Sequence, residues 1–148
     1  MHFFDLAIAN NILVPFFGMM LLTLVVWVYM YLRRINYILQ NGVAIDKLKN
    51  YEAIERIIPE AVNRPANNLK NLFELPILFY VVCLYLLIFK QVDLLSIYCA
   101  YGFLSIRIFH SIIHCTVNIV MWRFTAYFLF SICLWIMIVR SSLSVFNF

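Results

Sequence analysis

The residues of this chain that are best able to do chemistry form two polar patterns inside apolar segments. The first pattern places an amide and a carboxylate three positions apart, Asn71 and Glu74, shortly before Pro76. The second pattern places four polar side chains at the spacing of one helical face: Arg107, His110, His114 and Asn118. Such groups can form ion pairs, hold a metal or exchange protons near neutral pH. Whether they act together depends on the elements that carry them.

The composition indicates that lipid is the solvent of these elements. The 148 residues are 66% hydrophobic and 12% charged, with a mean hydropathy of +0.94. A soluble domain is about half apolar and about a quarter charged, and a chain this apolar cannot cover its own surface with polar groups. We therefore expect an all-α integral membrane protein. The net charge of +4 is interpreted as a signal of membrane orientation, and no nucleic-acid partner is expected.

Four apolar segments are long enough to cross a bilayer as helices. Their expected bounds are 12–32, 66–89, 94–120 and 124–140. Residues 90–93 are expected to form a tight turn between the second and third segments, and residues 122–123 a turn between the third and fourth. The first segment is too long for a signal-peptide core, so we expect it to be retained as a helix.

Basic residues are concentrated after the first segment. Seven of the 11 Lys and Arg residues lie within residues 33–70, whereas the first eleven residues contain none. The positive-inside rule therefore places the connection 33–65 in the cytoplasm and both termini on the non-cytoplasmic side. Within this connection, residues 43–58 are predicted to form a short amphipathic helix on the membrane surface. A bacterial inner membrane and the endoplasmic reticulum fit the sequence equally well.

The second segment must begin well before Pro76. Residues 76–89 would cover only about 21 Å at about 1.5 Å per residue, against a hydrocarbon core of about 30 Å. We therefore expect the helix to start near Pro65, with proline in its first turn, and to continue through Pro76 with a kink. In such a helix Asn71 and Glu74 lie on one face, at the cytoplasmic edge of the membrane.

Two environments are compatible with Glu74. The first is an ion pair with Lys70, four residues earlier, that reaches water. The second is a position facing the bundle, where Glu74 pairs with Arg107 of the third segment. We expect the second, because polar side chains that share one face of a membrane helix avoid lipid and turn inward.

The two histidines and the cysteines are only weak indications of a metal or redox site. His110 and His114 could hold a metal with Glu74 as a third ligand, but hydrogen bonding inside the bundle is their expected role and no metal is expected. None of the four cysteines has CxxC spacing, so all four are expected to be small packed residues: Cys83, Cys99, Cys115 and Cys133.

Taken together, these features resemble the MAPEG family, the membrane-associated proteins of eicosanoid and glutathione metabolism. The resemblance covers nearly the whole chain, as a single domain of residues 1–148. It is most specific in the stretches NRPANNLKNLFELPILFY and RIFHSIIHCTVNIVMWRF. The resemblance implies a homotrimer of four-helix subunits, with glutathione bound between neighbouring subunits near the cytoplasmic side.

The resemblance also implies roles for individual residues. Asn71 and Glu74 match residues that help to hold glutathione in the transferase members of the family, and Arg107 matches the first residue of the family's third-helix pattern. His110 and His114 stand where that pattern has two tyrosines, so they would line the same glutathione pocket and could accept protons.

Two further positions depart from the family pattern. Asn67 stands where transferase members have an arginine that contacts glutathione, and Met121 stands where the leukotriene synthase branch has an arginine that stabilises the thiolate. A thiol with a pKa of about 8.5 ionises at neutral pH only beside positive charge. Arg123 is the nearest candidate for this catalytic role, although it lies about 200° around a helix from Met121.

Three functions are compatible with these residues. The expected one is a glutathione-dependent transferase or peroxidase that acts on lipophilic electrophiles from the bilayer, with glutathione as co-substrate. The alternative is a non-enzymatic lipid-binding or scaffolding protein, in which the polar residues hold a trimer together. A small transporter or proton relay is a third. The retained Asn71, Glu74 and Arg107 favour the enzyme, whereas the missing arginines favour the scaffold.

Overall fold

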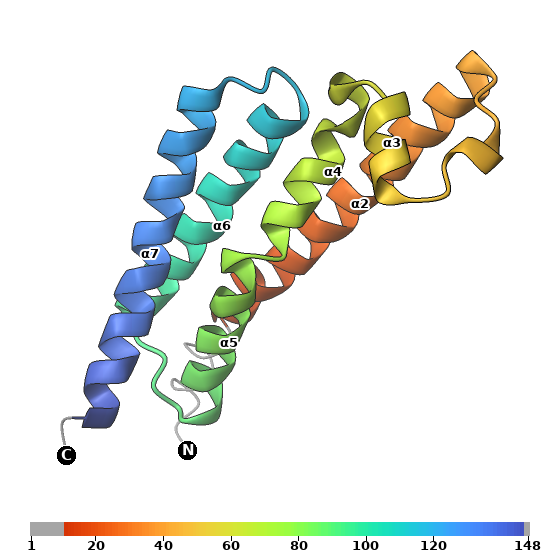
Figure 1. Cartoon of the computed structure of the whole chain (residues 1–148). Coiled ribbons are helices and arrows are strands. Elements are labelled where there is room, and N and C mark those ends of the chain that lie inside the picture. Colours follow the sequence, from red (N-terminus) through yellow and green to blue (C-terminus); the bar gives the residue numbers. More distant parts are fainter. Residues whose placement is uncertain (1–10, 147–148) are drawn as a thin grey trace.

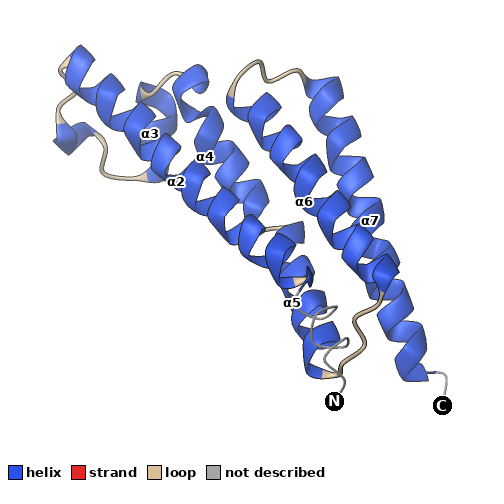
Figure 2. Cartoon of the chain, turned by 180° about the vertical axis from the view of Figure 1, so that it is seen from behind, coloured by secondary structure: helices blue, strands red, loops and turns tan. Residues whose placement is uncertain are grey.

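The computed structural model describes residues 11–146, which form a bundle of long helices (Figure 1). Its elements are α2 (Leu13–Asn41), η1 (Ile45–Lys47), α3 (Tyr51–Ile57), α4 (Glu60–Leu72), α5 (Leu75–Ile88), α6 (Leu94–Cys115) and α7 (Val120–Phe146). Within residues 11–146 there is no strand (Figure 2). The predicted all-α fold is confirmed.

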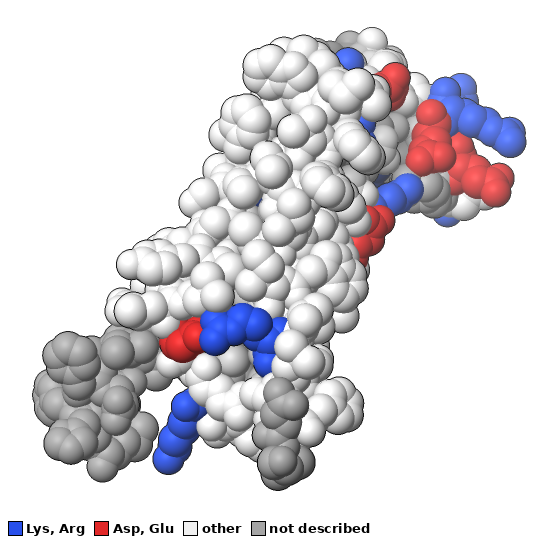
Figure 3. Space-filling model, turned by 90° about the vertical axis from the view of Figure 1, so that its left-hand side faces the viewer, with Lys and Arg blue, Asp and Glu red and all other residues white. Residues whose placement is uncertain are grey.

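In the part of the chain that the structure describes, four helical stretches are long and apolar enough to cross a membrane: Leu13–Asn41, Glu60–Ile88, Leu94–Cys115 and Val120–Phe146. On the face shown in Figure 3, charged side chains gather toward the two ends and a wide uncharged band lies between them. This distribution suits a bilayer, whose apolar core excludes charge. The chain is therefore an integral, multi-pass membrane protein.

The second crossing begins earlier than the sequence suggested, because Pro65 does not start a helix. It lies inside α4, which begins at Glu60 after Pro59. Proline has no N–H, so the carbonyl of Ala61 loses its partner in the α4 ladder. Nη2 of Arg33, from α2, donates to this carbonyl at 3.1 Å. A side chain of the neighbouring helix thus compensates for the proline.

The expected continuous helix through Pro76 is instead interrupted. α4 ends at Leu72, and α5 begins at Leu75 with Pro76 in its first turn. Between them Glu74 has φ −100° and ψ −107°, outside the helical region. Proline favours the first turn of a helix, so the sequence signal that was expected to kink one helix starts a second one.

The third crossing is shorter than expected, and the turn predicted at 122–123 is wrong. α6 ends at Cys115 and α7 already begins at Val120, so the connection is residues 116–119. Asn118 has a φ of 55°, a left-handed conformation that asparagine tolerates better than most residues. This residue turns the chain from α6 to α7.

The helices pack as α6 beside α7 and α2 beside α4, and α5 lies against α7 (Figure 1). Three aromatic rings join α5, α6 and α7. Phe79 stacks on Phe103 with centroids 4.4 Å apart and planes at 3°, and Phe103 meets Phe130 edge-on at 5.3 Å. All three rings are fully buried. They form the centre of the hydrophobic core, and Phe130 also contacts the buried side chain of Arg107.

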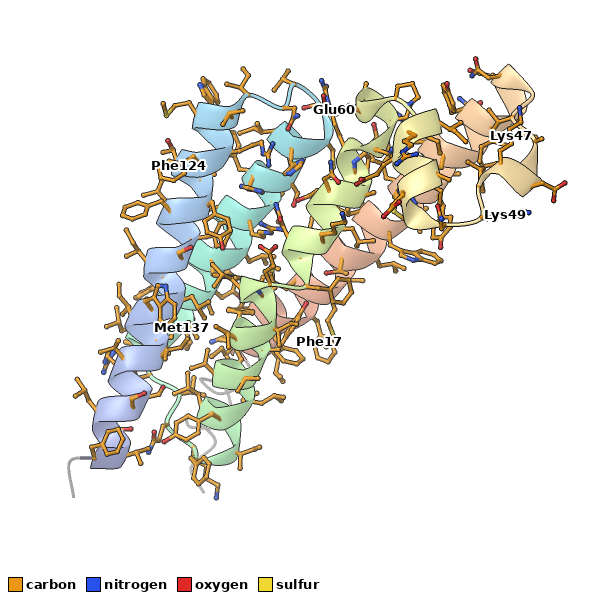
Figure 4. The ribbon with its side chains drawn as sticks, in the orientation of Figure 1. Phe17, Lys47, Lys49, Glu60, Phe124 and Met137 are labelled. Carbon is orange, nitrogen blue, oxygen red and sulfur yellow. The ribbon has the colours of Figure 1, made fainter. Side chains whose placement is uncertain are left out.

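The connection between α2 and α4 lies at the far end of α2 and returns beside that helix, and Lys47 and Lys49 lie on it (Figure 4). The predicted amphipathic segment forms two short helices, η1 and α3, rather than one. Asn50 separates them, because its Oδ1 accepts from the backbone N–H of Ala53 at 2.8 Å and caps α3.

The α5–α6 turn, at residues 89–93, is held by Asp93. Its Oδ1 caps α6 by accepting from the N–H of Ser96 at 2.8 Å, and its Oδ2 pairs with Nη2 of Arg140 on α7 at 2.7 Å. Partial burial raises the pKa of Asp93, but the hydrogen bonds from Ser96 and the charge of Arg140 outweigh it. The pKa of this carboxyl therefore lies below its usual value.

We predict that Phe103→Ala lowers the free energy of unfolding by about 2 kcal/mol or more. Loss of a buried phenyl ring costs about 3–5 kcal/mol in soluble cores, and less is expected in a membrane because lipid also solvates apolar groups. Unfolding in mixed micelles with increasing denaturing detergent measures this. Phe124→Ala on α7, where the ring is 65% exposed, is the control and should cost under about 0.5 kcal/mol. Equal losses would contradict the assignment of the core.

We also predict an acid-dependent loss of stability from Asp93. A carboxyl whose folded pKa is depressed stabilises the fold above its unfolded pKa of about 3.9, and this contribution is lost as the pH falls through the folded pKa. The difference in unfolding free energy between the wild type and Asp93→Asn should therefore be largest near pH 7 and shrink below about pH 4. A gap that persists at low pH would contradict the prediction.

Candidate functional site

Arg107 occupies the centre of a buried polar site between α4, α6 and α7. Arg107 is 0% exposed to solvent. Nη2 donates to Oδ1 of Asn68 on α4 at 3.4 Å, and the guanidinium carbon lies 5.2 Å from the ring centre of Phe130 on α7. Nε and Nη1 have no hydrogen-bond partner among the described residues. A cation in this position is costly unless anions or acceptors compensate it.

Asn68 organises this site, and sequence reasoning missed it. Its Oδ1 accepts from Arg107 and also from the hydroxyl of Ser111 at 3.4 Å, while its Nδ2 donates to Sγ of Cys115 at 3.5 Å. These three partners are spaced four residues apart, so they form one stripe along α6. One fully buried amide of α4 therefore contacts two turns of α6.

The two histidines lie beside Arg107, each 2% exposed. Their ring centres are 5.7 Å apart. Nδ1 of His110 lies 3.1 Å from the backbone carbonyl of Arg123, whereas Nε2 of His110 and both ring nitrogens of His114 have no partner among the described residues. α6 therefore turns Arg107, His110 and His114 inward together, as their spacing predicted.

Asn118 does not belong to this helical stripe, because α6 ends before it. Its amide instead joins the connection to two helices: Nδ2 donates to Oε1 of Glu60 at 3.1 Å, and Oδ1 accepts from Nη1 of Arg123 at 2.7 Å. Figure 4 shows Glu60 at the end of α4, beside this connection. Asn118 thus closes the end of the site rather than lining it.

Arg123 and Met121 take opposite directions on α7. Met121 is 69% exposed, whereas Arg123 is half-buried and directed toward Asn118. From the sequence, Arg123 was expected about 200° around a helix from Met121. Because α7 begins at Val120, both residues lie on α7, and its rotation brings Arg123 rather than Met121 to the histidine side.

Asn71 and Glu74 lie at the interruption between α4 and α5. Asn71 is half-buried and Glu74 is exposed. Among the described residues no ion pair within 4.0 Å joins Glu74 to Arg107, so the expected direct pair is wrong within one chain. Glu74 nevertheless interacts electrostatically with Arg107. Lys70 pairs with Glu55 of α3 at 3.7 Å.

Tyr127 of α7 is a second residue that sequence reasoning missed. Its ring centre lies 6.3 Å from that of His110 and 5.0 Å from that of Phe130. It also interacts electrostatically with Glu74 and Arg107. A phenol hydroxyl can donate or accept a hydrogen bond, so Tyr127 adds such a group where the second and fourth crossings approach.

The site is richer in donors than in acceptors. Arg107 and Arg123 each hydrogen-bond an amide and His110 contacts a backbone carbonyl, and neither ion pair found among the described residues includes one of these two arginines. Among residues 11–146, no group of three or more His, Cys, Asp or Glu side chains is placed to hold a metal. The arrangement suits a ligand that brings its own anionic or carbonyl oxygens.

Comparison with models of known families gives a match over residues 12–143, to the model described as MAPEG family. All the site residues described above lie within the matched range. Comparisons with curated proteins and with solved structures found no match.

We predict that Asn68→Leu destabilises the fold by about 1–3 kcal/mol, because the guanidinium of Arg107 and the hydroxyl of Ser111 lose a buried acceptor. Asn67→Leu, on the adjacent half-buried position of α4, is the matched control and should be nearly neutral. Unfolding of both variants in mixed micelles measures the difference. Similar losses for the two would mean that Asn68 does not organise the site.

Proposed function

Because the chain belongs to the MAPEG family, whose members are membrane-associated proteins of eicosanoid and glutathione metabolism and generally use glutathione, we propose that it is a glutathione-dependent enzyme of the membrane. Its substrates are lipophilic electrophiles that enter from the bilayer, and its reaction is transfer of glutathione or reduction of a peroxide.

The unsatisfied guanidinium of Arg107 is the observation that carries this proposal. Two of its nitrogens have no partner among the described residues although the residue is fully buried. Isolated buried charge costs several kcal/mol. Glutathione carries two carboxylates and several carbonyl oxygens, which supply the acceptors that the site lacks. The fit is one of charge and hydrogen-bonding chemistry.

Each side chain has a defined part in the proposed binding mode. Arg107 binds a carboxylate of glutathione, as the free donors of its guanidinium require. Asn71 can bind the peptide backbone of glutathione through its amide, and Glu74 can pair with the ammonium group. Both lie at the α4–α5 interruption, where the surface gives a ligand access. Glu74 and Arg107 therefore bind groups of opposite charge on one ligand.

The proposed chemistry assigns proton transfer to the histidines. An unpartnered ring nitrogen of His110 or His114 accepts the thiol proton, and Arg123 contributes positive charge beside the thiolate. In conjugation, the sulfur forms a bond to an electrophilic carbon while the bonding pair leaves with the displaced group. In peroxide reduction, two thiols become one disulfide while the hydroperoxide becomes an alcohol and water.

A second function, a non-enzymatic lipid-binding or scaffolding protein, is favoured by a different observation. Arg107, His110 and His114 are closed off from solvent within the single chain, with exposures of 0–2%. Glutathione reaches them only if α4 and α6 separate or if the site is formed differently in an oligomer. The homotrimer implied by the family stays a prediction. In a trimer, the exposed Glu74 would be available to a neighbouring subunit.

We predict that glutathione binds the detergent-purified full chain and that Glu74→Gln weakens this binding at least about 10-fold, or about 1.4 kcal/mol. Isothermal calorimetry measures the affinity. Thermal unfolding gives a second measure, because a ligand at about 100 times its Kd stabilises the native state by about 2.7 kcal/mol. Glu52→Gln, an exposed carboxylate on α3, is the control and should bind like the wild type.

No stabilisation of the wild type at millimolar glutathione would overturn this proposal. Stabilisation by a fatty acid alone would then support the scaffolding function. Equal losses in Glu74→Gln and Glu52→Gln would show that general surface charge, rather than Glu74, governs binding.

A further inference from the structure

An apolar groove of about 190 Å³ lies between α2 and α6, on a different side of α6 from the histidines. Val25 and Ile112, 63% and 57% exposed, stand at its mouth, so it opens outward from the bundle. Tyr29 and Thr116 also line it. Its lining exposes almost no polar surface. A groove of this kind in a membrane helix pair accepts a length of hydrocarbon chain.

Two arginines are attached to two of the residues that line this groove. Nη1 of Arg33 donates to the hydroxyl of Tyr29 at 2.9 Å, with its guanidinium carbon 5.7 Å from the ring centre. Nη1 of Arg64, from α4, donates to the backbone carbonyl of Thr116. Tyr29 and Thr116 belong to the two opposite walls, α2 and the end of α6. An arginine is therefore hydrogen-bonded to a lining residue on each wall of the groove.

Neither guanidinium is paired with a carboxylate within residues 11–146. The partners of Arg33 are a phenol and the carbonyl of Ala61, and the partner of Arg64 is a carbonyl. Neither ion pair found among the described residues includes Arg33 or Arg64, and Nε of Arg64 is buried without a hydrogen-bond partner. Arg34, the neighbour of Arg33, donates to the neutral amide of Asn63. Three arginines therefore lie at this end of the groove, whereas the carboxylate of Glu60, one helical turn before Arg64, binds the amide of Asn118.

Both arginines are connected to the first half of α4, Arg33 through its hydrogen bond and Arg64 as part of the helix. Arg33 is fixed to Ala61, one helical turn before Arg64. Because both side chains hold neutral partners, each has further N–H donors to offer. An oxyanion between them would be bound by charge from two sides, as arginine forks bind phosphate.

We propose that the α2–α6 groove binds an acyl chain of an anionic phospholipid, with the phosphate group held by Arg33 and Arg64. Basic pockets between membrane helices recognise anionic head groups, and an apolar groove beside such a pocket adds contact with the chain. The positive-inside expectation places these arginines at the cytoplasmic leaflet, where anionic lipids are enriched. Ser111 and Cys115 line the groove and also bond Asn68, but no residue assigned to the proposed glutathione pocket lines it, and neither arginine has a part in the chemistry proposed there.

The test compares two lipids that differ only in head group. The full chain is reconstituted in nanodiscs or mixed micelles with phosphatidylglycerol or with phosphatidylcholine of the same acyl chains. Lipids retained on the protein are counted by native mass spectrometry, and the thermal unfolding midpoint is recorded. We expect phosphatidylglycerol to be retained and to raise the midpoint, with at least about a 10-fold preference over phosphatidylcholine.

Two pairs of variants separate the head group from the chain. The double variant Arg33→Gln, Arg64→Gln should abolish the preference for phosphatidylglycerol, whereas Lys47→Gln, Lys49→Gln removes the same charge from the exposed connection and should keep it. Val25→Phe should block the groove and reduce retention of the lipid. Val14→Phe, an exposed valine of α2 outside the groove, should not. Val25→Phe leaves every hydrogen bond named here in place, so it tests the proposal even if the arginine variant fails to fold.

Several results would overturn the proposal. They are equal retention of the two lipids by the wild type, equal losses in the arginine and lysine variants, and displacement of the lipid by inorganic phosphate or glycerol phosphate. A change of oligomeric state in Val25→Phe without a change in lipid retention would also overturn it, since the groove would then be occupied by a second copy of the chain.

Discussion

A guanidinium without exposure to solvent imposes the main constraint on this bundle. Arg107 lies among apolar helices, where an uncompensated charge would destabilise the fold by more than most single contacts stabilise it. Three groups interact with the guanidinium: an amide oxygen of Asn68, the face of the Phe130 ring and the more distant charge of Glu74. Each of these comes from a different element. Arg107 therefore fixes how α4, the α4–α5 break and α7 lie around α6.

Backbone polar groups in a membrane also need hydrogen-bond partners, and this requirement explains side-chain contacts between α2 and α4. Pro65 removes an N–H from α4, and Arg33 replaces it by donating to the carbonyl of Ala61. Arg64 and Asn118 serve the end of α6 in a similar way, the one binding the carbonyl of Thr116 and the other turning the chain. Residues that first indicated membrane orientation thus also complete the helix ends.

Hydropathy and spacing were sufficient to predict four membrane helices, because long apolar runs in lipid have few alternatives to the helix. The ends of these helices were less predictable. Pro65 resembles a helix start in sequence, yet a side chain from another helix lets α4 begin at Glu60. In the same way, Asn118 fits the helical spacing of α6 but has a left-handed backbone. Both errors concern interactions between elements, which a single helical pattern does not contain.

The site was predicted more completely on α6 than on the other helices. The spacing of Arg107, His110 and His114 was enough to place them together, because a helix fixes the directions of its own side chains. On α4 the choice between Asn67 and Asn68 is a rotation of about 100°, and two adjacent amides give no local signal to decide it. Tyr127 had no signal at all, since its neighbours lie on other helices.

The interruption at Glu74 has a consequence for the membrane itself. It leaves terminal carbonyl groups of α4 and terminal N–H groups of α5 outside any continuous helical ladder, next to an exposed carboxylate. Hydrocarbon cannot satisfy these groups. The bilayer around this point must therefore be thinned or locally hydrated, or another protein surface must cover the interruption. An unbroken helix would have satisfied these groups by itself, so the break makes this side of the protein depend on water or on a protein partner.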